Sequence, residues 1–127
     1  ITSFANTFSQ QPGQSMQRDD ALLLHILLAA RKVIRVTGGK TYQDFLADDV
    51  LQDSVIRQIG IIGEAASKIS SAFRKAHPEV PWKDVIGMRH KVIHDYMKID
   101  LLKVWQVATD DVPLLAKAIE PYIPPEQ

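Results

Sequence analysis

Residues 49–73 read DVLQDSVIRQIGIIGEAASKISSAF, and this stretch decides the fold class. Its apolar residues recur at alternating steps of four and three, which is typical of a helix that buries one face. The residues of this seam are Val55, Ile59, Ile62, Ala66, Ile69 and Phe73. Asp48 or Asp49 is a suitable N-cap, and Pro78 disfavours helical backbone at His77. The stretch therefore predicts one long helix that ends at His77-Pro78.

Four other segments, one of them short, are expected to be helical, because capping residues, glycines and prolines bracket helical periodicity. They are residues 19–36, capped by Asp19 or Asp20 and ended by Gly38-Gly39; 42–47, capped by Thr41; 82–97, begun at Pro81-Trp82; and 101–122, capped by Asp100, kinked by Pro113 and stopped by Pro121. No segment alternates as a strand would. The predicted fold is all-α: an antiparallel four- to five-helix bundle, assembled as a homodimer.

The composition fits a globular protein of one domain. The chain has 127 residues, of which 46% are hydrophobic, with 15 basic and 15 acidic residues. There is no cysteine, which excludes disulfides, a thiolate nucleophile and cysteine-based zinc sites. We expect residues 1–15, which are polar, to be a disordered tail or a remnant of an added segment, and residues 16–127 to form the domain. No run is long enough to span a membrane, so a cytoplasmic location is expected.

The first helix is expected to be apolar around most of its circumference. Residues 22–28 read LLLHILL, so leucines and isoleucines occupy several faces of one helix. Such a helix is buried on more than one side. Together with the later apolar seams, it predicts more apolar surface than one small bundle covers, and hence a two-fold homodimer.

The most informative segment for function is residues 82–96, WKDVIGMRHKVIHDY. If it forms one straight helix, Arg89 lies in the middle of the apolar face. A buried arginine without a partner is costly to desolvate. Either Arg89 pairs with a carboxylate inside the bundle, or it lines a cleft that receives an anionic ligand.

Two histidines, His90 and His94, follow at a spacing of four residues. This spacing leaves open a metal site, a pair of ordinary surface histidines, or acid–base chemistry near neutral pH. No glutamate follows the first histidine and no third ligand is evident, so metal binding is the weakest of the three.

Residues 89–96, RHKVIHDY, resemble the R-x4-H-x-Y signature of the HEPN superfamily in its HepT toxin branch. The upstream segments IGEAA at residues 62–66 and WKDVIGMR at residues 82–89 are similar to that branch as well. The resemblance extends over about residues 17–123. It implies a helical bundle that dimerises, with the signatures of both chains lining one cleft.

The resemblance also implies a metal-independent endoribonuclease without a cofactor. Its catalytic residues would be Arg89 and His94, with His90 and Lys91 as candidate RNA-binding residues. HepT toxins pair with a minimal nucleotidyltransferase antitoxin, MntA, which transfers AMP to the signature tyrosine, here Tyr96. The alternatives are a catalytically silent helical partner of a nucleotidyltransferase, and a plain structural dimer in which Arg89 makes an internal ion pair.

Elementary chemistry is consistent with this assignment but restricts its geometry. Metal-free RNA cleavage needs a base, an acid and positive charge at the phosphorane, which histidine and arginine supply. On one straight helix, however, Arg89 and His94 lie about 140° apart. Either the helix ends near His94 or the site combines two subunits. Glu64 is read as a surface ion-pair partner of Lys68 rather than a catalytic group, and Gly60 and Gly63 as points of close helix approach.

Overall fold

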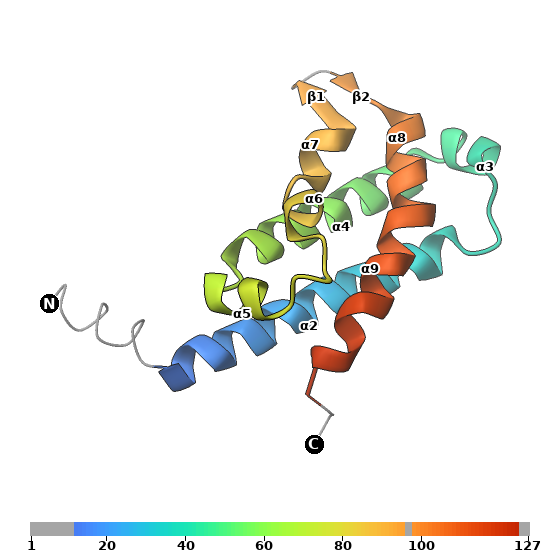
Figure 1. The fold of residues 1–127 in the computed structure, drawn as a ribbon. Helices are drawn as coiled ribbons and strands as arrows, with labels where there is room; N and C mark the ends of the chain where they lie inside the picture. The colour runs from blue at the N-terminus through green and yellow to red at the C-terminus, as the bar shows by residue number, and fades with distance from the viewer. Residues whose placement is uncertain (1–11, 96–97, 125–127) are drawn as a thin grey trace, which may run out of the picture.

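The computed structural model describes residues 12–95 and 98–124, with side chains from residue 18 onward except those of residues 94 and 95. It is a helical bundle with one small hairpin (Figure 1), which confirms the all-α class. The elements are α2 (Pro12–Thr37), α3 (Tyr42–Leu46), α4 (Asp49–Lys68), α5 (Ser71–Ala76), α6 (Trp82–Ile86), α7 (Met88–Val92), β1 (Ile93–Asp95), β2 (Lys98–Ile99), α8 (Leu101–Gln106), the π-helix η1 (Val107–Asp111), α9 (Val112–Ile119) and the 3₁₀ turn η2 (Glu120–Tyr122).

The long helices α2 and α4 form the base of the bundle, and α9 packs on α2 (Figure 1). The seam of α4 is buried as expected, since Val55, Ile59 and Ile62 are fully inaccessible. Phe45 of α3 and Ile119 of α9 join the same core. Leu24 and Leu28 of α2 remain 41% and 53% exposed, so one chain does not cover the whole apolar face of this helix.

Short polar caps fix where several elements begin. Thr41 forms a reciprocal capping box with Asp44 at the start of α3. The carboxylate of Asp48 accepts from Leu51 N at 3.0 Å, and that of Asp100 accepts from Lys103 N at 3.0 Å. Gly39 follows α2 with φ of 73°, a conformation that glycine adopts without strain. These four boundary predictions are confirmed.

The prediction of one unbroken helix from residue 49 to residue 77 is wrong at one place. The chain leaves helical geometry at Ile69, and Ser70 caps α5 by accepting from Phe73 N at 3.1 Å. Ser70 in turn donates from its backbone N–H and its hydroxyl to the buried carboxylate of Asp19, at 2.9 and 2.6 Å. Asp19 or Asp20 was expected to cap this helix, but α2 already begins at Pro12. Asp19 lies within α2 and accepts the hydrogen bonds from Ser70 at the break.

The segment 82–97 was expected to be one helix, and this expectation is also wrong. Gly87 separates α6 from α7, and α7 ends at Val92. Ile93 then pairs with Ile99 in an antiparallel hairpin of β1 and β2, although no strand was expected. The two strands hold three and two residues, too few to show an alternating pattern in the sequence.

The disruption expected at Pro113 takes the form of a π-helical turn. Proline has no N–H to donate to Thr109, so the regular hydrogen-bond ladder cannot continue there. In η1 the Val112 N–H donates instead to Val107 O, five residues back. Among the described helices, none combines the length and apolar character that a membrane span requires.

Candidate functional site around Arg89

Arg89 lies on α7, the short helix that crosses α4 (Figure 1). Met88 and Val92 form the buried side of this helix, one turn apart, and Arg89 is exposed beside them. The expectation that Arg89 occupies the middle of the apolar face is therefore wrong. That expectation assumed one straight helix from Trp82 onward. The break at Gly87 rotates the residues of α7 relative to those of α6, so the faces of the two helices no longer align.

Two glycines of α4 allow this crossing to be close. A Cβ on Gly63 would lie 3.3 Å from Ile86 O and 3.9 Å from Arg89 Cβ. A Cβ on Gly60 would lie 4.0 Å from Arg89 Cδ. The stem of Arg89 thus runs along the glycine side of α4, which confirms that Gly63 serves close helix approach.

Arg89 is in the lining of two adjacent hollows, which share Gly60 and Glu64. The larger, about 430 Å³, lies between α2 and α4 and also has Arg57 and His25 in its lining. The smaller, about 180 Å³, includes His90 and Ser67. Of the two readings of Arg89 left open by the sequence, the structure favours the cleft: within the described ranges 18–93 and 98–124, no carboxylate forms an ion pair with it.

Glu64 is the one carboxylate in the lining of both hollows. Its Oε1 lies 3.3 Å from Lys68 Nζ, and both side chains are more than half exposed. This confirms the expected surface pair at a spacing of four residues. Such a pair contributes little to stability, but it neutralises the negative charge next to Arg89.

The remaining signature residues are only partly described. His90 is exposed and Lys91 is half-buried on α7. The backbone of His94 belongs to β1, so it does not continue the helix that carries Arg89. The 140° separation on one helix therefore does not apply, and neither does the helical pairing of His90 with His94. The His94 side chain and the whole of Tyr96 lie outside the described residues.

Metal ligation concerns only the described side chains here, and the His94 side chain is outside them. No group of three His, Asp or Glu residues among the described side chains comes close enough to hold an ion. Sequence reasoning missed Arg57 and His25 as neighbours of Arg89. Arg57, Gly60, Ile61, Glu64 and Lys68 do share one stripe of α4 by spacing, but only the packing of α7 shows that Arg89 joins it.

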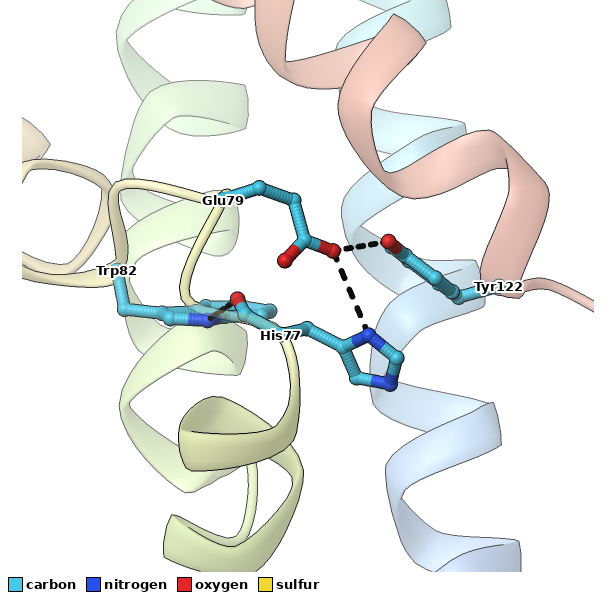
Figure 2. Close-up of polar contacts among 4 residues, drawn as sticks. All are labelled: His77, Glu79, Trp82 and Tyr122. Atoms are coloured by element: carbon cyan, nitrogen blue, oxygen red, sulfur yellow. Dashed lines mark hydrogen bonds and ion pairs between the residues drawn. The ribbon is translucent and has the colours of Figure 1, made fainter.

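A second group of titratable residues, which lines neither hollow at Arg89, joins the loop after α5 to Tyr122 of η2 (Figure 2). The Tyr122 hydroxyl donates to Glu79, and His77 Nδ1 lies 3.4 Å from the same carboxylate oxygen. The Trp82 indole N–H donates to His77 O at 2.9 Å. The hydrogen bond from Tyr122 lowers the pKa of Glu79, and the same bond raises the pKa of Tyr122.

This arrangement suits a structural contact better than catalysis. A phenol with a raised pKa is a poorer nucleophile and a poorer acid at neutral pH. The His77 ring lies between Phe73 and Tyr122, with ring centroids 4.4 and 4.1 Å away. The group therefore joins the loop after α5 to the C-terminal turn, and Arg89 remains the centre of the candidate site.

Comparison with known proteins gives the family of this chain. The model of the family described as "Ribonuclease HepT-like" matches residues 26–122. A Methanocaldococcus jannaschii protein, provisionally named an RNase, is 39% identical over 100 residues, which cover 79% of this chain and 92% of that protein. A Thermococcus cleftensis protein named "Probable ribonuclease HepT" is 40% identical over 79 residues, covering 62% of this chain and 72% of that protein.

A third relative, from Caldanaerobacter subterraneus and also provisionally named an RNase, is 34% identical over 105 residues, with 83% of this chain and 94% of that protein covered. No solved structure matches the chain. The matched range contains α3 to η2 and residues 26–37 of α2, together with the Arg89 site. The chain therefore belongs to the HepT-like ribonucleases, the HEPN-type family that its signature resembles.

Proposed function

We propose that this chain is an endoribonuclease that cleaves RNA without a metal ion. The observation that carries the proposal is Arg89, a cation with a packed stem and an exposed head, held over a hollow without a carboxylate partner among the described residues. Such a group is suited to an anionic ligand, and the phosphate of RNA is the anion that a ribonuclease must bind.

The proposed chemistry uses a 2′-hydroxyl of the substrate as the nucleophile. His94 takes its proton while the oxygen attacks the adjacent phosphorus, and the bond to the 5′-oxygen breaks as that oxygen is protonated. The products are a 2′,3′-cyclic phosphate and a 5′-hydroxyl. Arg89 stabilises the additional negative charge of the phosphorane, and His90 and Lys91 bind neighbouring phosphates. In a homodimer, the His94 of each chain supplies one proton-transfer group.

The test is cleavage of single-stranded RNA by the purified chain in excess EDTA. We expect cleavage to persist, and the fragments to carry 5′-hydroxyl ends. Loss of activity with EDTA and recovery with Mg²⁺ would reject the metal-free mechanism. A chain that cleaves no RNA but binds a nucleotidyltransferase would be the silent helical partner, which is the alternative function.

We also propose that the chain is the toxin of a toxin–antitoxin pair, controlled by AMP transfer to Tyr96. This proposal is supported by the tyrosine in the signature, seven residues after Arg89. An adenylyl group there adds bulk and negative charge close in sequence to the cations of the site, so RNA binding and cleavage should fall together. The partner would be a minimal nucleotidyltransferase of the MntA type.

Intact mass measured after incubation with that nucleotidyltransferase and ATP tests the modification site. Wild type is expected to gain the mass of one or more AMP groups and to lose activity. Tyr96→Phe is expected to keep its mass and its ribonuclease activity. AMP on the phenylalanine variant would place the modification at another residue and end this part of the proposal.

A further inference from the structure

The hollow beside Arg89 is lined by residues along one side of α4. It is bounded across its width by Leu22 and His25 of α2, and we refer to it as the α4 groove. Its lining on α4 runs from Arg57 to Lys68 at helical spacings of three and four residues. At 1.5 Å per residue, these ends are about 16 Å apart along the helix axis. The α4 groove is therefore long enough for several linked groups, beyond the one at Arg89.

Under the proposed function, the part of the α4 groove at Arg89 holds the scissile phosphate, and the part at Arg57 extends beyond it. The Arg89 stem lies against Gly60, which is one helical turn from Arg57. Arg57 is exposed, and like Arg89 it forms no ion pair within the part of the chain that the structure describes. Arg57 of α4 and Arg89 of α7 therefore place two positive charges in the lining of one hollow, and an anion bound there would be attracted by both.

The charge balance of the α4 groove indicates what it binds. Its one carboxylate, Glu64, pairs with Lys68 at 3.3 Å. Arg57 and Arg89 remain as uncompensated cations, and His25 lies on the opposite wall. Leu22 and Ile61 provide apolar surface between these charges. Cations interspersed with apolar surface along a groove suit a single strand of nucleic acid, whose phosphates alternate with sugars and exposed bases.

We infer that the α4 groove holds the single-stranded RNA that extends from the scissile phosphate, and that Arg57 binds a neighbouring phosphate of that strand. This inference rests on the proposed ribonuclease function and adds a second cation, outside the signature, to substrate binding. Arg57 does not act on the reacting atoms. It positions the strand whose scissile phosphate lies at Arg89.

Binding of a fluorescein-labelled, fully 2′-O-methylated RNA single strand tests this inference. The methyl group removes the 2′-hydroxyl nucleophile, so binding is measured whether or not the proposed chemistry is correct. We expect Arg57→Gln to weaken binding about tenfold at low salt. The slope of log K against log salt should become shallower by about 0.7, the value for one phosphate contact on a single strand. With cleavable RNA, Arg57→Gln should raise KM more than it lowers kcat.

Two variants provide matched controls. Arg57→Lys keeps the charge and should keep the salt slope of wild type. Lys117→Gln removes one positive charge from α9, which contributes no residue to the described lining of the α4 groove, and should bind RNA as wild type does. Circular dichroism should show the same helix content for all variants.

The other outcomes overturn the inference, except the last, which separates it from the proposed catalytic function. If Arg57→Gln binds RNA with the affinity and salt slope of wild type, or if Lys117→Gln weakens binding equally, the α4 groove does not hold the strand. If wild type does not bind the RNA, the inference fails as well. If Arg57→Gln changes the mass in light scattering, Arg57 belongs to a subunit interface instead. If binding depends on Arg57 but no RNA is cleaved, the proposed catalytic function fails and the inference about the α4 groove stands.

Discussion

At the scale of single residues, Arg89 combines a constrained stem with an accessible charge. Its Cβ and Cδ lie beside the two glycines of α4, which restricts the directions that the guanidinium can take. A preorganised cation costs little reorganisation when charge develops on a phosphorane. The exposed Lys98 and Lys103 carry the same charge, but neither is in the lining of the two hollows at Arg89.

The Glu79–Tyr122 contact predicts how stability changes with pH. Since folding lowers the pKa of Glu79 below its ordinary 4.5, the contact stabilises the fold above that pH and is lost as the pH falls through the folded-state value. Since folding raises the pKa of Tyr122 above 10.0, the contact is also lost as the pH rises through that raised value.

Tyr122→Phe keeps the ring that packs on Phe73 and His77 but removes the hydroxyl. We expect wild type to melt at a higher temperature than this variant between about pH 5 and pH 9, with the difference shrinking in acid below pH 4. Thermal unfolding followed by circular dichroism across this pH range is the measurement. A difference that grows as the pH falls would contradict the assigned contact.

At the scale of elements, the crossing of α6 and α7 over α4 determines where the site forms. Gly63 is the closest point, because a Cβ there would lie 3.3 Å from a backbone oxygen of Ile86. A Cβ on Gly60 would meet only the Arg89 side chain, at an ordinary contact distance of 4.0 Å. The two glycines of one helix are therefore expected to respond differently to the same substitution.

Gly60→Ala should stabilise the protein by about 0.5–1 kcal/mol, because alanine is favoured over glycine inside a helix. Gly63→Ala should leave the free energy of unfolding unchanged or lower it, because α6 must shift to make room for the methyl group. Urea unfolding of both variants measures the difference. If Gly63→Ala were at least as stable as Gly60→Ala, the close approach of α6 to α4 would be wrong.

The sequence predicts the helix boundaries that are set by contacts between residues close together in the chain. It does not predict the boundaries that are set by contacts between residues far apart in the chain. Thr41, Asp48 and Asp100 cap helices through hydrogen bonds to residues three positions away, so their roles follow from spacing alone. The break at Ser70 depends on Asp19, which lies 51 residues away. The periodicity of apolar residues does not predict a contact between residues so far apart in the sequence.

Residue types and spacing in the sequence single out Arg89, His94 and Tyr96 as candidate site residues, but they do not give the arrangement of the site. The predicted orientation of Arg89 is wrong because α6 ends and α7 begins at Gly87. A single glycine inside a helical pattern can be accommodated in a continuous helix or can end it, and the pattern alone does not show which. Arg57 was missed because its link to Arg89 is made across two elements.

At the scale of the whole molecule, apolar side chains remain exposed on several elements. Leu28 of α2 is 53% exposed, Leu102 of α8 is 48% exposed and Leu114 of α9 is 69% exposed. Single exposed residues of this kind are common, but α2 also exposes Leu24 and Ile34. This supports the proposal that α2 contributes to a two-fold interface. The placement of the Arg89 and His94 of both chains near the axis is a separate proposal, which comes from the sequence.

Light scattering coupled to size exclusion tests the assembly. At micromolar concentration we expect twice the mass of the 14.2 kDa chain. Leu28→Asp places a charge on the exposed apolar surface of α2 and should shift the population toward the monomer. A monomer mass for wild type would contradict the proposed homodimer.

The most direct test of the central claim, that Arg89 and His94 cleave RNA, is the rate of RNA cleavage by Arg89→Ala and His94→Ala in EDTA, with wild type and Lys117→Gln measured in parallel. Both alanine variants should keep the fold, because Arg89 is exposed and His94 follows the end of α7. We predict that each lowers the rate by about 10²-fold or more, as expected for removing phosphorane stabilisation or acid–base catalysis. Lys117→Gln should cleave as wild type does. A folded Arg89→Ala or His94→Ala protein with the full wild-type rate would contradict the account.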